Sequence, residues 1–291
     1  MSPLGKFASA LLLPVSLALV AAPLDGTFAL QTSAAQTNGF LRATTIGGNP
    51  LKQHLDIWMT RKPSAQPILR YSVDMTKLLH LIIVSDDFAR FLHVHPVLGP
   101  DGHFTIDQRF PEPALYHVYA DGEPAGIGQQ VFRFDLAVAG GAAAGARDLP
   151  STGPKRSAGP YTVELSTTTV PAGSDVPVTV HIRRGTRPAG DLHPYLGALA
   201  HAVFLDARDL SYVHVHPLPL AARAMNSMPD MAMSSMPGMG GMDMKPLPDS
   251  ATSSPDMQLR LRLREAGTYK LWLQFRGGRS LYVAPFVITA H

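Results

Sequence analysis

The 291-residue sequence contains no cysteine. This absence excludes disulfide bonds, a lipid-modified N-terminal cysteine, zinc–thiolate sites and thiol nucleophiles. It also excludes a blue-copper electron-transfer centre, because that centre needs a cysteine ligand. The folded state must therefore be held together by its apolar cores alone.

Charge is also scarce, since charged residues make up 16% of the chain and the net charge is only +3. The basic residues are spread along the sequence, so no nucleic-acid partner is expected. The chain shows no paired-carboxylate signature, nucleophile elbow or phosphate loop, and we expect that it is not an enzyme.

Long apolar runs are missing except at the N-terminus. There "FASALLLPVSLALVAA" (7–22) follows Lys6, which is typical of an export signal. We predict a signal peptide over residues 1–35, cleaved after Ala35 or nearer Ala22, with an uncleaved anchor as the alternative. No other window is long enough to span a bilayer. The mature protein is then expected in the periplasm or secreted, without membrane insertion.

The tetrapeptide HVHP occurs twice, at 93–96 and at 214–217. "HLIIVSDDFARFLHVHP" (80–96) aligns without a gap to "HAVFLDARDLSYVHVHP" (201–217). The match resumes between "FTIDQRFPEPALYHVYAD" (104–121) and "MQLRLRLREAGTYKLWLQ" (257–274), after extra residues in the second copy. This pattern indicates a duplicated domain.

Each copy contains about seven short segments of alternating polarity, separated by turn residues, in a chain with 26 prolines and 25 glycines. Such patterning predicts an all-β protein of two tandem immunoglobulin/cupredoxin-like antiparallel β-sandwich domains. The segment "MQLRLRLRE" predicts a strand with Leu259, Leu261 and Leu263 inward. The expected order is a domain over 39–140, a flexible linker over 141–157, and a domain over 158–291 with an insertion at 218–256.

Each copy also has the histidine spacing of a metal site. A hairpin with Val84 opposite Phe91 and Ile82 opposite His93 brings three imidazoles to one face, where they can converge on one ion. The predicted ligands are His80, His93 and His95 in the first copy and His201, His214 and His216 in the second. His103, His117 and His193 are candidate fourth ligands. Alternatively, the repeated histidines are core residues kept from a common ancestor.

Imidazoles with an ordinary pKa near 6.5 would release their metal as the pH falls from about 6.5 to 5.

The insertion contains "MNSMPDMAMSSMPGMGGMDM" (225–244), with no large apolar residue to pack with its methionines. Thioethers are soft, uncharged ligands that favour Cu(I), or Ag(I), and resist loss in an oxidising compartment. A low-complexity loop is the alternative. The predicted Cu(I) ligands are Met225, Met228, Met231, Met233, Met236, Met239, Met242 and Met244.

The methionine tract resembles those of bacterial periplasmic copper-resistance proteins, namely the CopC-type carriers and the multicopper oxidases. The two domains resemble secreted bacterial proteins with a "YLGAxxH…HVHP" pattern. The second copy has this pattern at Tyr195–His201 and His214–Pro217, whereas the first copy has "DMTKLLH" instead. The N-terminal histidine site of the CopC type has no counterpart here. The resemblance implies periplasmic copper handling.

The sequence thus predicts a periplasmic copper-binding protein, with Cu(I) at the methionines and Cu(II) or another borderline ion at the histidines. It would sequester copper or deliver it to a partner such as a periplasmic copper oxidase or transporter. The alternative is a non-catalytic tandem module that binds an envelope protein without metal.

Overall fold

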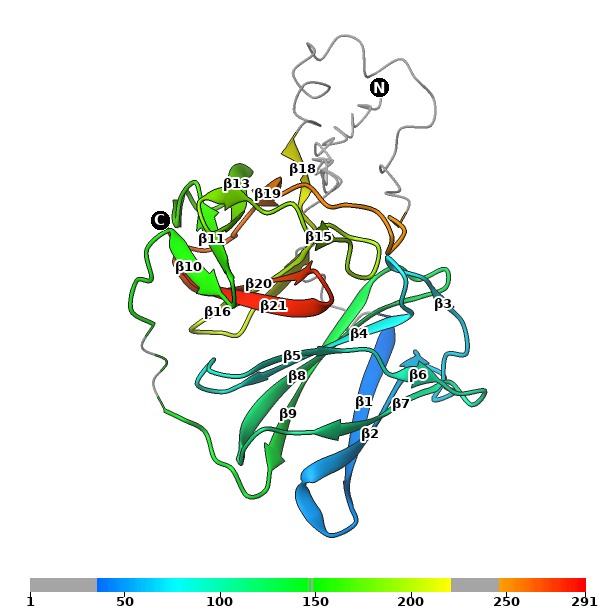
Figure 1. Cartoon of the computed structure of the whole chain (residues 1–291). Coiled ribbons are helices and arrows are strands. Elements are labelled where there is room, and N and C mark those ends of the chain that lie inside the picture. The colour runs from blue at the N-terminus through cyan, green and yellow to red at the C-terminus, as the bar shows by residue number, and fades with distance from the viewer. Residues whose placement is uncertain (1–35, 146, 148, 221–245) are drawn as a thin grey trace, which may run out of the picture.

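The computed structural model describes residues 36–145, 147, 149–220 and 246–291. Figure 1 shows two all-β units, joined by a segment that runs along one side of the molecule. The described residues contain no α-helix, so the predicted all-β class with two tandem sandwiches is confirmed. The predicted signal peptide and methionine tract lie outside the described residues. Within the described part, no helical segment has the length and apolar character needed to cross a membrane.

The first domain packs two sheets around one core. One sheet has the order β1-β2-β7-β6, and the other has the order β3-β8-β4-β5 with β9 beside β8. The strands are β1 (Thr37–Ile46), β2 (Asn49–Arg61), β3 (Tyr71–Ser72), β4 (Leu79–Ser85), β5 (Phe91–Val94), β6 (Val97–Leu98), β7 (His103–Arg109), β8 (Ala114–Pro124) and β9 (Gln130–Val138).

The second domain repeats this plan. Its sheets have the orders β10-β11-β13-β19-β18, with β14 beside β13, and β12-β21-β20-β16-β17, with β15 beside β20. The strands are β10 (Lys155–Ala158), β11 (Tyr161–Leu165), β12 (Thr169–Val170), β13 (Val176–Arg184), β14 (Arg187–Pro188), β15 (Leu192–His193), β16 (His201–Asp206), β17 (Tyr212–Val215), β18 (Leu218–Pro219), β19 (Asp256–Leu261), β20 (Gly267–Gly277) and β21 (Ser280–Ala290). All pairs are antiparallel except the short pair β12–β21, which is parallel.

Both domains carry the same corner hydrogen bond. The hydroxyl of Tyr116 donates to the carbonyl of Glu112 (2.9 Å), and that of Tyr269 donates to the carbonyl of Glu265 (2.8 Å). A tyrosine bonded to the backbone a few residues upstream is a feature of immunoglobulin-like sandwiches. The predicted inward leucines of the second domain are confirmed, since Leu259, Leu261 and Leu263 are buried.

The sequence missed β1 and overestimated β3. After Thr37, no residue of β1 is fully buried, so the strand lacks the apolar alternation on which a prediction depends. Leu41 and Ala43 pack partly buried against the core, and the strand pairs with β2 through a turn at Gly47 and Gly48, whose φ values of 58° and 69° favour glycine. The alternating pattern also indicates one of the seven strands of the first copy at 68–74, but only Tyr71 and Ser72 form a strand there.

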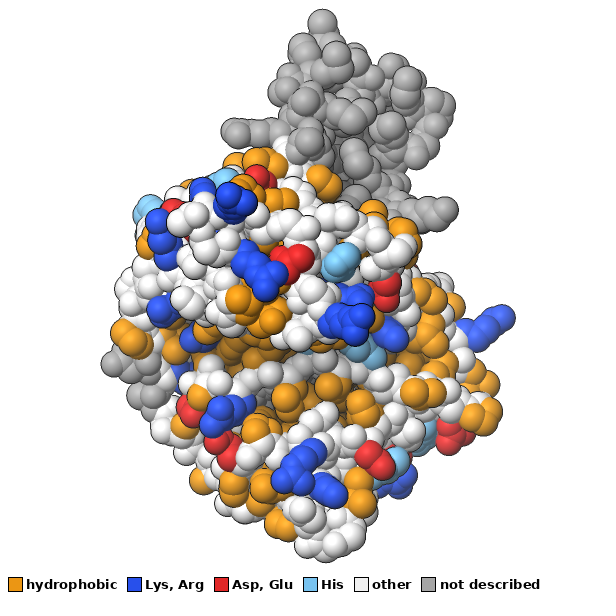
Figure 2. All heavy atoms as spheres, viewed as in Figure 1, with side chains coloured by type: hydrophobic (Ala, Val, Ile, Leu, Met, Phe, Trp, Pro, Cys, Tyr) orange, Lys and Arg blue, Asp and Glu red, His pale blue; other side chains and the backbone are white. Residues whose placement is uncertain are grey.

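A third apolar core joins the two domains. In β4, Leu81 and Ile83 belong to the core of their own domain, whereas Ile82 and Val84 point to the other domain. In β16, Val203 and Leu205 do the same from the opposite side. Because side chains alternate along a strand, His80 and His201 lie on these interdomain faces. Figure 2 shows apolar side chains along the junction of the two domains.

The interface has an approximate two-fold arrangement. Phe91 stacks on Trp272, with ring centroids 5.3 Å apart, and Tyr212 stacks on Tyr119 at 4.9 Å. In the aligned repeats Tyr212 corresponds to Phe91, and Trp272 corresponds to Tyr119. The hydroxyl of Tyr119 also donates to the carbonyl of Leu210 (2.9 Å). The duplicated domains therefore bury equivalent faces against each other.

Candidate metal centre

The two hairpins have the predicted register. Ile82 pairs with His93 and Val84 with Phe91 in the first domain. Val203 pairs with His214 in the second domain. A shift of one residue would send the histidines to the opposite face, so this register is what places them at the domain interface.

The first triad forms a closed triangle of ring nitrogens. Nδ1 of His80 lies 3.0 Å from Nε2 of His93, and Nε2 of His95 lies 3.3 Å and 3.1 Å from these two atoms. An ion bound at 2.0–2.1 Å with octahedral or tetrahedral angles would separate its ligand nitrogens by about 2.8–3.4 Å. The triangle therefore has the dimensions of one face of a metal's coordination shell.

The second triad repeats this geometry. Nδ1 of His201 lies 3.3 Å from Nε2 of His214 and 3.1 Å from Nε2 of His216. The same ring atoms are used at equivalent positions, so the arrangement is a property of the repeated unit.

The two triads meet across the domain interface. The ring centroids of His80 and His214 are 5.4 Å apart, and those of His93 and His201 are 5.1 Å apart. Ring nitrogens of His93, His201 and His214 lie within 4.8 Å of one another. The sequence treated the triads as separate sites, one per domain. The structure instead brings all six histidines into one buried interdomain cluster.

Hydrogen bonds outside the cluster determine which nitrogens carry protons. Nε2 of His80 faces the carbonyl of Asp74 (3.4 Å), and Nε2 of His201 faces the carbonyl of Tyr195 (2.9 Å). A carbonyl only accepts, so these Nε2 atoms donate and the Nδ1 atoms keep a lone pair.

The other pair of histidines is oriented from the opposite domain. Nδ1 of His93 lies 2.8 Å from Oε1 of Gln274 in the second domain, and Nδ1 of His214 lies 3.6 Å from Oδ2 of Asp121 in the first. Nδ1 of His93 therefore donates to Gln274, and the carboxylate of Asp121, at ion-pair distance, favours a proton on Nδ1 of His214, so the two Nε2 atoms keep lone pairs directed into the cluster.

Two lone pairs consequently face each other in each triad. Nδ1 of His80 and Nε2 of His93 are both acceptors at 3.0 Å, so this contact cannot be a hydrogen bond. A proton on Nε2 of His95 can be donated to either Nδ1 of His80 or Nε2 of His93. It does not place a hydrogen between those two acceptors. The contact of His201 with His214 at 3.3 Å presents the same problem. A cation that accepts all three lone pairs resolves it, and the buried triads can hold a metal ion.

The cluster is largely shielded from water. His80 and His201 are each 1% exposed, and His95 and His216 are half-buried. Burial lowers the pKa of His80 to about 4 and that of His95 to about 3. Burial also lowers the pKa values of His93, His201 and His216 well below the usual range. These five imidazoles are therefore uncharged at neutral pH, with one ring nitrogen free of a proton, as metal ligands must be.

Asp121 supplies the one carboxylate buried against the cluster among the described residues. Burial acts to raise its pKa, but the contact with His214 and the amide of Gln129 (2.7 Å) outweigh this, and the pKa lies below its usual value. The hydroxyl of Tyr212 donates to the same carboxylate at 3.1 Å. Asp121 is thus an anion that can balance the charge of a bound cation.

Sequence reasoning missed Asp121 and Gln274. They occupy equivalent positions, as the last residues of the aligned segments 104–121 and 257–274. A polar residue at the same place in both copies, within an otherwise apolar strand, was the signal that could have identified them.

The three other histidines proposed as fourth ligands are placed elsewhere. His103 pairs with Asp56 on the outer face of β2 and β7 (2.6 Å), and Nδ1 of His193 bonds the carbonyl of Ala251 (3.0 Å). His117 lies between Asp86 and Asp135, at 2.7 Å from each. Among the described residues, the groups of side chains that could hold a metal ion consist of the repeated histidines and include none of these three, so the expectation of a fourth histidine from this group is not supported.

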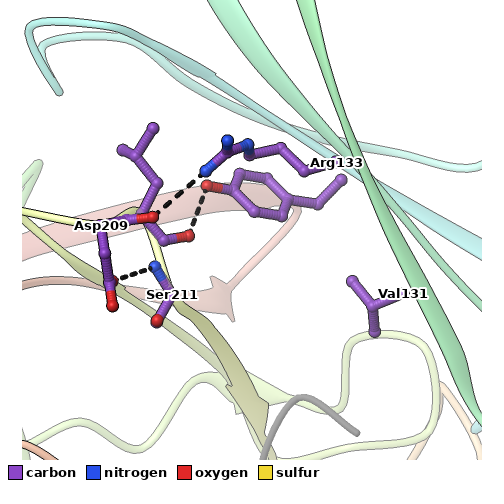
Figure 3. Close-up of a pocket in the computed structure, with 6 residues that line it drawn as sticks. Val131, Arg133, Asp209 and Ser211 are labelled. Atoms are coloured by element: carbon purple, nitrogen blue, oxygen red, sulfur yellow. Dashed lines mark hydrogen bonds between the residues drawn. The ribbon is translucent and has the colours of Figure 1, made fainter. Parts of the chain in front are cut away.

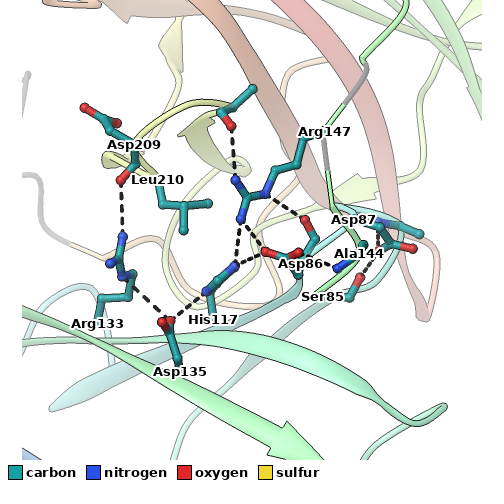
Figure 4. A network of polar contacts seen from close by, with 12 residues as sticks. Ser85, Asp86, Asp87, His117, Arg133, Asp135, Ala144, Arg147, Asp209 and Leu210 are labelled. Atoms are coloured by element: carbon teal, nitrogen blue, oxygen red, sulfur yellow. Dashed lines mark hydrogen bonds and ion pairs between the residues drawn. The ribbon is translucent and has the colours of Figure 1, made fainter. Parts of the chain in front are cut away.

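The network around His117 ties the linker to both domains. Arg147 donates to the side chain and the carbonyl of Asp86 and to the carbonyl of Ala207 in the second domain (Figure 4). The carboxylates and cations of this network are paired with one another, so we assign the network a structural role.

A small pocket opens at the edge of the domain interface, between Tyr119, Arg133 and Ser211 (Figure 3). Its polar groups are engaged, since Arg133 donates to the carbonyl of Asp209 (3.2 Å) and Tyr119 to the carbonyl of Leu210 (2.9 Å). The histidine cluster is therefore the stronger candidate site.

Comparison with known families finds one match. A family described as a domain of unknown function (DUF8832) matches residues 44–140 and again 155–291, and the chain belongs to this family. No curated protein matches the chain. The repeated match agrees with the duplication seen in both sequence and fold.

Proposed function

We propose that this tandem-domain protein binds copper in the interdomain histidine cluster, and that it sequesters or delivers copper in the periplasm. The observation that carries the proposal is the contact of two lone pairs, on His80 and His93, at 3.0 Å. Buried acceptors that face each other are unfavourable unless a donor or a cation lies between them. The same contact occurs in the second domain, so the cluster is shaped for a cation.

The ligand types favour copper over other ions. Imidazole suits copper, zinc, nickel and iron, and copper(II) binds most tightly of the divalent first-row ions. The thioether tract at 225–244 begins nine residues after His216 in the sequence and suits Cu(I). Copper is the common ion that both ligand sets accept, in two oxidation states. The periplasmic location in this proposal rests on the export signal predicted at the N-terminus.

The burial of the cluster supports storage more than rapid exchange. The ligands lie between two domains joined by an apolar core, so release requires the half-buried rings of His95 and His216 to move or the domains to separate. Delivery would then depend on a partner, such as a periplasmic copper oxidase or transporter, that acts on the domain interface.

The test is a copper titration of the purified mature protein against a competing chelator. The double variant His80→Ala, His201→Ala should lose Cu(II) binding at the cluster. His54→Ala is the matched control, because His54 forms a surface pair with Asp107 (2.7 Å) and should leave binding unchanged. If the wild-type protein holds no Cu(II) while correctly folded, the proposal fails and a metal-free module that binds an envelope protein is favoured.

A further inference from the structure

We infer that the cluster holds two metal ions, one in each histidine triad, and that the pair shares a small bridging ligand of the hydroxide class. This inference rests on the proposed function, since it specifies the stoichiometry and the exogenous ligand of the same site.

The first argument is that each triad is a complete ligand set. His80, His93 and His95 present three ring nitrogens with separations of 3.0–3.3 Å. The second triad has separations of 3.1 and 3.3 Å from Nδ1 of His201. Each set has its own outer hydrogen bonds that direct lone pairs inward. Neither triad needs a ligand from the other domain to bind an ion.

The second argument is that one ion cannot satisfy both triads. A single ion bound by His93, His201 and His214, whose nitrogens lie within 4.8 Å of one another, would take the lone pair of His93 away from His80. Nδ1 of His80 would then accept at most the proton of Nε2 of His95 at 3.3 Å, and both His80 and His95 would stay without an ion. One ion in each triad instead coordinates all six imidazoles, including the two pairs of facing acceptors at 3.0 Å and 3.3 Å.

The third argument concerns charge. Two cations held by rings whose centroids are 5.1–5.4 Å apart repel each other strongly in a buried environment. Asp121 provides one negative charge, at the side of His214. Three imidazoles leave each ion with an open coordination position, and metal-bound water loses a proton easily. A hydroxide between the ions would form when one bound water releases its proton to solvent.

The experiment counts ions and unpaired spins. Native mass spectrometry of the Zn²⁺-loaded full-length protein should show two ions, since thioethers of the methionine tract do not compete for zinc. In the Cu(II)-loaded protein, electron paramagnetic resonance should detect far fewer spins than Cu(II) ions, because two bridged ions couple. His95→Ala and His216→Ala should each retain one zinc ion and give one full Cu(II) spin.

If the wild type binds one zinc ion and shows one full Cu(II) spin, and if His95→Ala and His216→Ala each lose both, the inference of two ions is wrong. The cluster would then hold a single shared ion. Two bound Cu(II) ions with two independent spins would contradict the inferred bridging ligand. Absence of any zinc or Cu(II) in the wild type would instead refute the proposed function. A circular dichroism melt establishes that each variant is folded, and His95→Gln and His216→Gln provide less disruptive replacements.

Discussion

His93 and Gln274 are 181 positions apart in the chain and belong to different domains, yet Nδ1 of His93 lies 2.8 Å from Oε1 of Gln274. The equivalent contact in the other direction joins His214 to Asp121 at 3.6 Å. Each domain thus orients a histidine of the cluster that belongs to the other. The two contacts differ in charge, because one partner is a neutral amide and the other is a carboxylate.

This difference predicts that Asp121→Asn weakens Cu(II) binding at the second triad. A carboxylate that accepts from a ligand imidazole increases the basicity of the ligand, and its loss typically costs 10–100-fold in affinity. Competition titration should show this reduction for one of the two binding steps only. Asp107→Asn, which removes the surface partner of His54, is the control. Equal weakening of both steps would contradict the assignment of Asp121 to His214.

Metal should stabilise the protein against heat through the interdomain cluster. A ligand at 100 times its dissociation constant stabilises the folded state by about 2.7 kcal/mol. We expect Cu(II) or Zn²⁺ to raise the melting temperature of the wild type and to have no such effect on the variant His80→Ala, His201→Ala. Differential scanning calorimetry with and without metal is the measurement, and an equal rise in both proteins would place the ion elsewhere.

The metal-free protein should lose stability as the pH falls from about 6.5 to 4. The unfolded chain takes up protons on its histidines near pH 6.5, whereas the folded pKa of His80 is about 4. In this window the unfolded state binds more protons, so the free energy of unfolding decreases by about 1.4 kcal/mol per pH unit for such a histidine. Over the whole window His80 alone accounts for about 3 kcal/mol.

Urea denaturation at pH 7 and pH 4.5 measures this effect. His80→Gln should flatten the dependence, and His54→Ala should leave it unchanged. The same low pKa values revise the expectation that metal is lost between pH 6.5 and 5. Because protons compete poorly with the ion at these buried rings, Cu(II) should remain bound well below pH 6. Release near pH 6.5 would show that the rings are accessible and have ordinary pKa values.

Deletion of residues 225–244 should remove Cu(I) and Ag(I) capacity without loss of the fold. The described residues on both sides stay anchored, since Leu218 and Pro219 pair with β19 and Leu247 N donates to the carbonyl of Gly197 (2.9 Å). We expect a small change in melting temperature and unchanged Zn²⁺ binding. A melting temperature lowered by many degrees, with unchanged Cu(I) stoichiometry, would contradict the role assigned to the methionines.

The fold class and the two hairpins could be predicted because their determinants are local. Alternation within 80–96 and 201–217 sets which residues share a face, and a turn sets which residues pair. Because both copies show the same pattern, the sequence supports the shared face and the residue pairing twice. By contrast β1 escaped prediction, since it contributes only the partly buried Leu41 and Ala43 to the core and depends largely on its pairing with β2.

The single cluster depended on tertiary structure. The run "HLIIVS" of β4 is buried on both faces, and such a continuous apolar strand indicates a second covered face without identifying what covers it. The partner of that face is the equivalent strand β16, more than a hundred residues away in sequence. No local sequence pattern indicates which face of each domain will pack against the other domain, because that packing depends on the fit of whole surfaces. The sequence by itself therefore determined two triads of imidazoles, and only the packing of the domains decided that the six rings lie together, with Asp121 and Gln274 to orient them.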